Sequence, residues 1–575
     1  MKTSSTTDGY APPFLLMQIR RYLLELDVSI FYFLSFTGLL AITLLVIFYR
    51  LGDHGIINGN ESLYIESARE MLVSGNYAIP TLNGLPYLEK PPLFVWLIAI
   101  FTHLFGTSEF ASRMVTALAT LALVISVARF SKLLRITATG IGAGFFLITS
   151  VGIDIMSRVA MPDMFLTALF TIACLHFLAA LQMPNSNKLR VCAALLGAAS
   201  LIKGLLPIAL FSIIVMTFYW LHPSRRADIL KLMRDRIAAL ILCLPLTLWL
   251  IAIEIRESGA IYDFIVNEHV MRYLGLREPH DYYSGSVLYY VPRLFLFFFP
   301  WVGVLVFGWL ATKRSEDQSK LEIRRFLWLC VWIPFGFFSL SNAKANYYII
   351  LCLPPMAMLV ADYLPALFRN RQRINLVMSI TVPVMLLVML WMYRMWAIST
   401  GRTLPLFTTH DGSFPLTIGI VLFLSLIAVF FIQIGWRHAS ILCLGGLIIP
   451  LSLEFNHIVA RAEPLMSART MATYIQENFP DKSVSMFQDF ESFGALPIYL
   501  GRTIPIIDST SADLFAGQKK YPYHPNFLTS EQVLESNSRM LIIVMRNNEN
   551  AFMNAKVHNA FDKVVEIGPA ILYTN

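Results

Sequence analysis

Charged residues and cysteines are both scarce in this chain, and each scarcity excludes a class of protein. Only 14% of the 575 residues are Asp, Glu, Lys or Arg, while 56% are hydrophobic and the mean hydropathy is +0.62. A soluble protein of this length would carry far more charge. Disulfide frameworks and cysteine metal sites are also disfavoured, because the cysteines lack zinc-type spacing and lie in or beside apolar runs. They are Cys174, Cys192, Cys243, Cys330, Cys352 and Cys443.

Motifs for nucleotide chemistry are missing as well. The sequence contains no Walker A pattern and no Ser-centred nucleophile elbow, and it leaves no room for a cytoplasmic nucleotide-sugar domain. The net charge of +8 comes from basic clusters between apolar runs, which is the pattern of cytoplasmic loops in membrane proteins. We therefore expect neither a nucleotide cofactor nor a nucleic-acid partner.

Apolar runs near the length of a membrane span recur along most of the chain. A transmembrane helix needs about 20 apolar residues. All the basic clusters fall on one side if every run crosses the bilayer, which is a strong internal check. We predict an α-helical polytopic membrane protein with about 13 spans, at 27–49, 110–128, 137–153, 164–182, 190–203, 205–221, 237–253, 286–311, 326–341, 347–367, 375–398, 415–434 and 440–458.

The chain divides into a membrane part and a polar C-terminal part. Residues 1–458 are predicted to form the transmembrane domain, with a charged first outer loop at 50–109 that contains amphipathic juxtamembrane helices. Residues 459–575 are predicted to form a small α/β domain with a partly parallel sheet outside the membrane. Its expected strands are 483–487, 503–507, 540–544 and 570–574, and a helix is expected from Ser467 to Asn478.

The first outer loop carries the first candidate site residues. Glu61 stands at the start of an amphipathic helix, where the helix dipole favours a carboxylate, so it can be a catalytic group or only a cap. Lys90 precedes Pro91, which favours extended backbone and displays Glu89 and Lys90 on a rigid segment. An ordinary surface ion pair is the alternative for those two residues.

Isolated polar residues also begin or end several apolar runs on the outer side. Asp163 follows a proline at the start of a span, and Lys203 lies between two spans. Helix capping and snorkelling would explain them without any chemistry. His269 and Arg272 lie three residues apart on one helical face, where a metal or phosphate site is the minority interpretation beside a structural histidine.

Cations on the outer side suit the phosphate of a lipid. Lys344 lies in a very short outer loop beside Tyr347 and Tyr348. Together with Lys90 and Arg272 it could hold a phosphate at a depth where screening is weak.

Several stretches resemble one enzyme family. The run NESLYIESAREMLVSGNYAIPTLNGLPYLEKPPLFVW at 60–96 resembles the first periplasmic loop of bacterial aminoarabinose transferases and their relatives among the protein mannosyltransferases. The similarity continues in order through AMPDMFLTA, LIKGLLPIA, NEHVMRYL, DYYSGSVLYYVPRLFLFFFPW, SLSNAKANYYIILCLPP and ALPIYLGRTIPIID, so it covers nearly the whole chain. The resemblance implies a type C membrane glycosyltransferase fold and an inverting transfer from a lipid-linked donor.

The resemblance also implies roles for individual residues. The family usually opens the loop with Asp-Glu, but here the pair is Asn60-Glu61, so either Glu61 or Asp163 would serve as the base. This chain has Leu63 at the position where the family tends to carry Arg, so one possible phosphate contact is missing. The remaining matches are Glu89 and His269 at positions that hold a divalent metal (Zn, or Mg or Mn) in some relatives, Lys90, Arg272, Tyr347 and Tyr348 near the lipid phosphate, and Lys203 and Lys344 at recurrent basic positions.

The expected function is therefore transfer of a sugar from a polyprenyl-phosphate donor to an envelope acceptor. The acceptor would be a lipid A-like lipid, a glycan or a protein, reached at the periplasmic face of the bacterial inner membrane among membrane lipids. One alternative is a lipid-linked sugar flippase or transporter, although the sequence lacks two related halves. The other alternative is a catalytically inactive, lipid-binding relative, which the amide at Asn60 favours.

Overall fold

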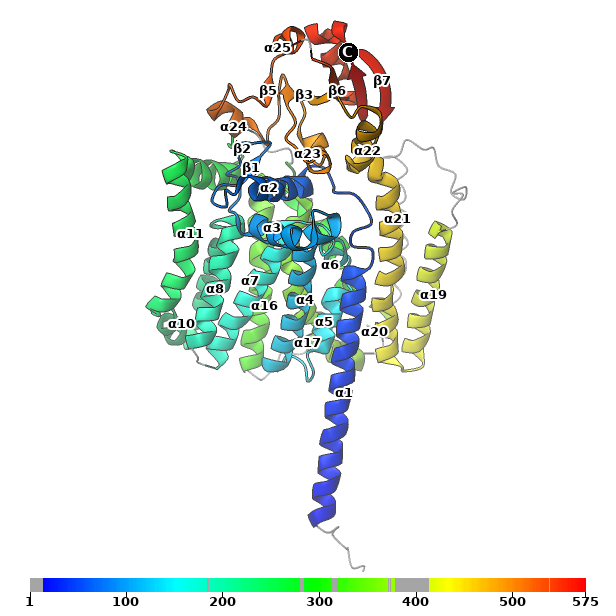
Figure 1. The fold of residues 1–575 in the computed structure, drawn as a ribbon. Helices are drawn as coiled ribbons and strands as arrows, with labels where there is room; N and C mark the ends of the chain where they lie inside the picture. Colours follow the sequence, from blue (N-terminus) through cyan, green and yellow to red (C-terminus); the bar gives the residue numbers. More distant parts are fainter. Residues whose placement is uncertain are drawn as a thin grey trace, which may run out of the picture.

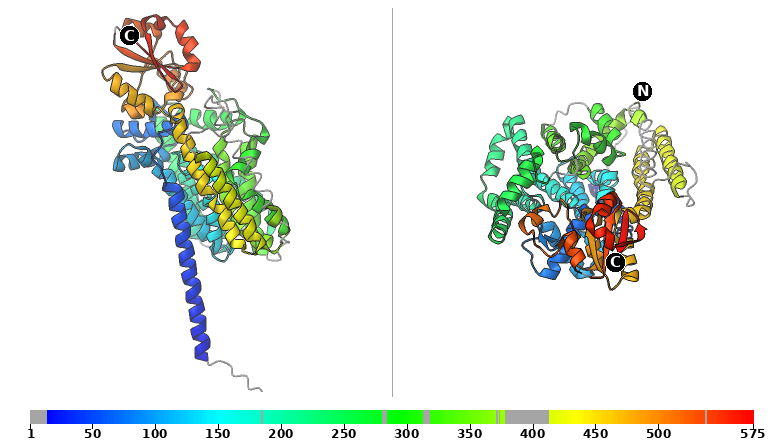
Figure 2. Two further views of the ribbon diagram at one scale, coloured as in Figure 1. Left: turned by 90° about the vertical axis from the view of Figure 1, so that its right-hand side faces the viewer. Right: turned by 90° about the horizontal axis from the view of Figure 1, so that it is seen from above.

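The chain folds into an upright helical bundle with a small sheet domain at one end (Figure 1). The structure is a computed structural model that describes residues 14–183, 186–279, 284–312, 318–370, 372, 374–377, 413–536 and 538–575. The first outer loop lies between the bundle and the sheet domain, and helix α1 (Phe14–Phe48) extends beyond the opposite end of the bundle. Seen from above, the sheet domain covers this loop and only part of the bundle (Figure 2).

Long apolar helices build the bundle. Within the described ranges, 8 helices are long and apolar enough to cross a membrane, and 2 bent pairs bring the number to 10. The pairs are α9 (Leu206–Leu221) with η1 and α10 (Pro223–Met233), and η3 and α14 (Val287–Phe297) with α15 (Val302–Ala311). The other helices are α1, α4 (Glu109–Leu133), α7 (Pro162–Gln182), α11 (Arg236–Arg256), α16 (Gln318–Leu340), η4 with α17 (Asn346–Arg369), α19 (Ser413–Gln433), and α20 with α21 (Arg437–Met466).

The predicted polytopic helical fold is confirmed, although about 13 spans were expected and the described residues give 8, or up to 10 with the bent pairs. The run at 137–153 forms two short helices, α5 (Ile141–Ile148) and α6 (Val151–Met156). The run at 190–203 belongs to α8 (Ser186–Lys203), which packs between α7 and α11. Most of the run at 375–398 lies outside the described residues.

The first outer loop is built from helices α2 (Asn60–Ser74) and α3 (Leu93–Phe105), which lie across the end of the bundle (Figure 1). Between them, strands β1 (Thr81–Leu82) and β2 (Leu85–Pro86) form a hairpin. Its turn is Asn83-Gly84, and both residues have positive φ, as this tight turn requires. A helix lying in the membrane interface would expose its polar face to water. The polar face of α2 is instead covered by the sheet domain, and Glu66 and Glu70 are buried.

The C-terminal domain contains a six-stranded sheet in the order β5-β4-β3-β6-β8-β7. Four strands are parallel: β5 (Phe527–Leu528), β4 (Ile506–Ile507), β3 (Ser483–Phe487) and β6 (Met540–Met545). Strands β8 (Ala570–Thr574) and β7 (Asp562–Ile567) are antiparallel to their neighbours. The helices are α22 (Arg469–Asn478), α23 (Leu496–Leu500), α24 (Phe515–Lys520), α25 (Ser530–Glu535) and α26 (Glu549–Asn554), and α21 leads into the domain by continuing to Met466.

The first outer loop and the C-terminal domain share one hydrophobic core. Leu63 and Leu82 from the loop pack in the same cluster as Phe490 and Ile504 from the domain. Asn83 strengthens this contact, because its side-chain amide donates to the Ile504 carbonyl at 2.9 Å and accepts from the Ile504 N–H at 2.9 Å. The domain is therefore fixed over the loop, and it forms the roof of a cavity between the loop and the bundle.

Candidate active site

Two adjoining cavities lie where the bundle, the first outer loop and the C-terminal domain meet. The larger cavity, called the chamber here, has a volume of about 790 Å³, and the smaller cavity, called the groove, has a volume of about 390 Å³. The residues that line both are Glu89, Lys90, Lys203, Arg272, Ala343 and Tyr348. Charged side chains thus stand at the junction of the two spaces.

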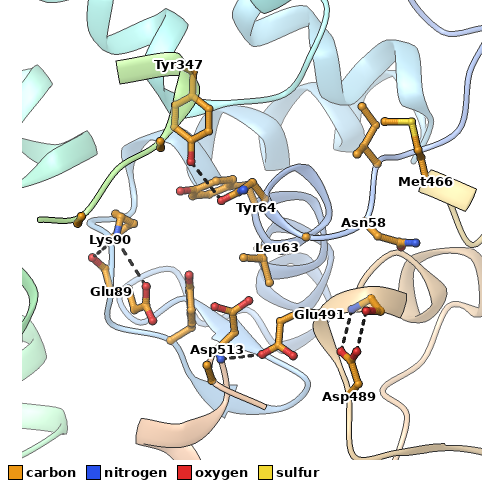
Figure 3. A pocket seen from close by; sticks show the side chains of 18 of the residues that line it. Asn58, Leu63, Tyr64, Glu89, Lys90, Tyr347, Met466, Asp489, Glu491 and Asp513 are labelled. Atoms are coloured by element: carbon orange, nitrogen blue, oxygen red, sulfur yellow. Dashed lines mark hydrogen bonds and ion pairs between the residues drawn. The ribbon is translucent and has the colours of Figure 1, made fainter. Parts of the chain in front are cut away.

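The walls of the chamber differ in charge. Figure 3 shows Glu89 and Lys90 on one side of it, with Tyr347 nearby, and the acids Asp513, Glu491 and Asp489 on another side. Burial, followed by the charges of Glu89 and Glu491, raises the pKa of Asp513 well above its ordinary value. The C-terminal domain therefore gives the chamber an acidic wall that the sequence alone did not predict.

The groove has apolar walls. It is lined chiefly by side chains of α9, of the segment around α13 (Arg272–Leu274) and of the end of α16. Those apolar residues are Leu205, Leu206, Ala209, Val270, Tyr273, Leu274, Phe337 and Phe338. Such a surface is suited to a hydrocarbon chain whose polar head lies at the junction with the chamber.

Five charged residues form a cluster at this junction. Arg277 Nη2 contacts Glu89 Oε1, and Arg277 Nε contacts Glu268 Oε1. Lys90 Nζ lies 3.7 Å from Glu89 Oε2 and 3.8 Å from Glu268 Oε2, and Arg272 Nη1 lies 3.1 Å from Glu268 Oε2. Three cations thus surround two carboxylates.

Burial and charge perturb the pKa values inside this cluster. Burial, reinforced by Arg272, lowers the pKa of Lys90 to about 8. Burial alone would raise the pKa of Glu89, but Arg277, Lys90 and Arg272 outweigh it and lower that pKa. Burial and the charge of Glu89 raise the pKa of Glu268. These opposed shifts are typical of functional sites.

Asp163 and Lys203 form an ion pair that faces the chamber. Asp163 is in the first turn of α7, directly after Pro162, and Lys203 ends α8. The Lys203 ammonium also lies 4.4 Å from the centre of the Tyr348 ring. The chain can break after Lys203 because Gly204 has φ +59° and a Cβ there would lie 2.2 Å from His269 Nε2.

Glu61 lines neither the chamber nor the groove, and its predicted catalytic role stays a prediction. Its carboxylate is 1% exposed and receives Arg113 Nε at 2.8 Å and Arg113 Nη2 at 3.0 Å. It also accepts from the Ala160 N–H at 2.8 Å and the Ile57 N–H at 2.9 Å. Arg113 and these hydrogen bonds outweigh the effect of burial and lower the pKa of Glu61. The four donors arrange this carboxylate as the counter-ion of Arg113.

His269 lines the groove, but its two nitrogens are both engaged. Nδ1 lies 2.8 Å from the Phe264 carbonyl, and Nε2 accepts from the Leu205 N–H at 3.2 Å. Glu89, the other predicted metal ligand, is held by Arg277. Among the residues that the structure describes, no group of 3 or more His, Cys, Asp or Glu is placed to hold a metal ion. Glu89 and His269 as arranged do not fit a divalent metal.

Lys344 and the two tyrosines line the chamber in different ways. Two N–H groups of the buried Lys344 ammonium donate to the Phe338 and Ser339 carbonyls at 2.9 and 2.7 Å, so this lysine caps the end of α16. Its predicted contact with a phosphate is thereby reduced to the third N–H. Tyr347 Oη lies 3.4 Å from Asn60 Oδ1, which places the amide that replaces the family's acid at the chamber wall.

Sequence reasoning missed several residues of the site. Arg277 lies only two residues after the segment 267–275, so a search for cations that extended slightly beyond this segment would have found it. The acids of the C-terminal domain carried no usable signal, because Asp513 is more than 400 residues from Glu89 along the chain. Arg113 stands inside an apolar span, and a buried arginine there should have prompted a search for its carboxylate partner.

Comparisons with known proteins show which sequences and which fold this chain resembles. Residues 89–251 match the family described as dolichyl-phosphate-mannose-protein mannosyltransferase. The undecaprenyl phosphate-alpha-4-amino-4-deoxy-L-arabinose arabinosyl transferase of Shewanella sediminis is 30% identical over 361 residues, which are 60% of this chain and 64% of that protein. A Proteus mirabilis enzyme of the same name, numbered 1, is 29% identical over 56% of this chain and 58% of its own length. The chain thus matches less than two thirds of the length of these relatives.

A solved structure extends the match to the whole fold. The crystal structure of ArnT from Cupriavidus metallidurans bound to undecaprenyl phosphate superposes with a TM-score of 0.75, at 19% identity, over 94% of this chain and 97% of that chain. The chain is therefore a multi-pass membrane protein with the type C glycosyltransferase fold. In particular, the predicted resemblance to the bacterial aminoarabinose transferases is confirmed in both sequence and fold.

Proposed function

We propose that this protein is an inverting glycosyltransferase that moves a sugar from a polyprenyl-phosphate donor to a lipid A-like acceptor. The observation that carries the proposal is the junction of the two cavities, where Lys90 and Arg272 line both an apolar groove and a polar chamber. A polyprenyl chain suits the groove, its phosphate suits the cations, and its sugar would project into the chamber. The names of the relatives describe transfer of a sugar from undecaprenyl phosphate, which is the same chemistry.

The proposed reaction is a direct displacement. Asp163, paired with Lys203, accepts the proton of an acceptor hydroxyl or phosphate. The acceptor oxygen attacks the anomeric carbon, the bond from that carbon to the phosphate oxygen breaks, and the configuration inverts. Lys90 and Arg272 stabilise the charge that develops on the departing polyprenyl phosphate. Cations that are already fixed at the junction are effective because they need no reorganisation during the reaction.

An amino sugar is the donor that the chamber favours. The chamber wall contributed by the C-terminal domain carries the side chains of Asp489 and Glu491 and that of Asp513, whose raised pKa favours its neutral form. A protonated amine is attracted to this wall, while the phosphate is attracted to the cations at the junction, so the two charged ends of the donor would fix its orientation. The 4-amino-4-deoxy-L-arabinose in the relatives' names has this charge pattern. The active face would be periplasmic, because the basic clusters lie on the other side of the membrane.

The proposal is tested with purified protein in lipid nanodiscs, a synthetic polyprenyl-phosphate donor with a labelled sugar, and lipid A. We expect label to appear in lipid A, and we expect Lys90→Ala to abolish transfer without lowering the unfolding temperature. A flippase would move the donor between leaflets of a vesicle and leave lipid A unlabelled. An inactive relative would transfer nothing until Asn60→Asp restored the family's acid, and either outcome would overturn the proposal.

A further inference from the structure

The charge cluster at the cavity junction is already complete without a metal ion. Glu89 and Glu268 contribute two negative charges, and Lys90, Arg272 and Arg277 contribute three positive charges. Among the described residues, three cationic side chains thus surround the two carboxylates. A divalent cation that entered the cluster would lie close to these cations, where burial makes the repulsion strong.

Every oxygen of the two carboxylates lies within 4.0 Å of a cationic nitrogen. Arg277 takes Oε1 of Glu89 through Nη2 and Oε1 of Glu268 through Nε. Arg272 Nη1 lies 3.9 Å from Glu89 Oε2 and 3.1 Å from Glu268 Oε2, and Lys90 lies within 3.8 Å of both Oε2 atoms. Arg277 is the residue at the centre, because its side chain is only 8% exposed and its planar guanidinium bridges the two acids.

The third ligand that a metal would need is also committed elsewhere. His269 receives the Leu205 N–H on Nε2 and contacts the Phe264 carbonyl with Nδ1. These contacts fix the ring against the break between α8 and α9. Metal binding to the two carboxylates would require the displacement of Arg277, and His269 could join such a site only after release from these contacts.

We propose that Arg277, and not a divalent metal ion, holds Glu89 and Glu268 together and so positions Lys90 and Arg272 for an anionic lipid phosphate. The proposal rests on the proposed function only in naming the lipid phosphate as the ligand. Arg277 acts as a positioning residue, because it contacts the acids that orient the two cations. Lys90 and Arg272, which line both cavities, then face the phosphate.

The first experiment measures metal directly on the purified full-length protein. After dialysis against Zn²⁺ or Mn²⁺, elemental analysis and calorimetry should find no stoichiometric site in the wild type. Arg277→Ala removes the bridging cation and should create one site that Glu89→Gln in the same chain abolishes again. Arg190→Ala is the matched control, because Arg190 pairs with Asp235 at 3.2 Å outside both cavities. A wild-type protein that holds one metal ion and loses it on Glu89→Gln overturns the proposal.

A second experiment separates positioning from folding. Arg277→Ala should weaken donor binding by about 10- to 100-fold, the cost typical of removing a residue that orients binding groups, and added guanidinium ion should restore part of it. Arg277→Lys keeps the charge but loses the planar bridge, so it should show an intermediate effect and remain testable if the alanine variant does not fold. Equal donor binding in Arg277→Lys, Arg277→Ala and wild type would contradict the positioning role. Metal uptake is read independently of sugar transfer, so the two proposals can fail separately.

Discussion

Replacing Glu61 by alanine is the change that best separates a structural from a catalytic role for this acid. The carboxylate is 1% exposed, its partner Arg113 is 0% exposed, and neither lines a cavity. Alanine would leave the guanidinium without its counter-ion and would remove the acceptor for the N–H groups of Ile57 and Ala160. We expect loss of stability as the primary effect.

The size of the loss follows from the contacts. Removing one partner of a buried ion pair costs about 3–5 kcal/mol of the free energy of unfolding. Each buried N–H left without an acceptor costs about 1–3 kcal/mol when nothing replaces it. Arg113 keeps its hydrogen bonds to the carbonyls of Leu51, His54 and Gly55, which limits the total. We therefore expect a loss of about 3–5 kcal/mol for Glu61→Ala and a smaller loss for Glu61→Gln, which retains one acceptor oxygen.

The assay is the temperature at which the detergent-purified protein loses its monodisperse size-exclusion peak. Glu61→Ala and Arg113→Ala should lower it by similar amounts, and the double variant should lower it by less than their sum because the two residues share one interaction. Transfer activity should fall only in proportion to the folded fraction. If Glu61→Gln unfolded at the wild-type temperature yet transferred no sugar, the structural assignment would be refuted.

Three further predictions address the chamber and its roof. Asp163→Asn should reduce labelled-sugar transfer by about 10²- to 10⁴-fold at an unchanged unfolding temperature, and near-normal transfer would exclude Asp163 as the base. Because the pKa of Lys90 is about 8, its ammonium is lost as the pH rises through that value, so donor affinity measured by calorimetry should fall there in the wild type. Lys90→Arg stays charged and should bind the donor equally on both sides of pH 8, and a parallel fall in this variant would exclude Lys90 as the cause. Glu109→Gln weakens the Arg469 contact that anchors the C-terminal domain, at a cost of about 1.5–3 kcal/mol, so limited proteolysis of that domain should become faster than in Glu531→Gln, which alters only an exposed pair.

The C-terminal sheet was predictable from sequence where its strands are buried. The segments 483–487 and 570–574 coincide with β3 and β8, because an apolar run bounded by polar residues has few other ways to be buried. Strand β7 was missed because it is a largely exposed strand at the edge of the sheet, with charged residues such as Lys563 and Glu566 in its sequence. Strand β5 was missed because its two residues are too few to show the alternation of polar and apolar side chains that identifies a strand.

The helical bundle was predictable as a set of apolar helices but not in their number or their breaks, since about 13 spans were expected and the described residues give 8, or up to 10 with the bent pairs. The apolar run at 137–153 gives no sign of ending, but the chain turns at Thr149 and Ser150, whose hydroxyls donate to the carbonyls of Phe145 and Leu147. Such local competition for backbone carbonyls is invisible to an average of hydropathy.

The candidate site was predictable only as far as membrane topology reaches. Placing Lys90, Asp163, Lys203 and Arg272 on one side of the bilayer was enough to anticipate that they share a space, and all four line the chamber. Topology does not reveal which acid meets which base. It could not show that Glu61 is bound by Arg113, near the N-terminal end of α4.

The shared core of the first loop and the C-terminal domain has a consequence for biosynthesis. Asn83 and Ile504, which bond to each other, are separated by 421 positions, so the loop leaves the ribosome long before its partner exists. Until then, Leu63, Leu82 and their neighbours have no cover and resemble a misfolded surface. The chamber is therefore completed only after the C-terminal domain has folded, and a nascent chain stalled before the domain would be an early target for proteases.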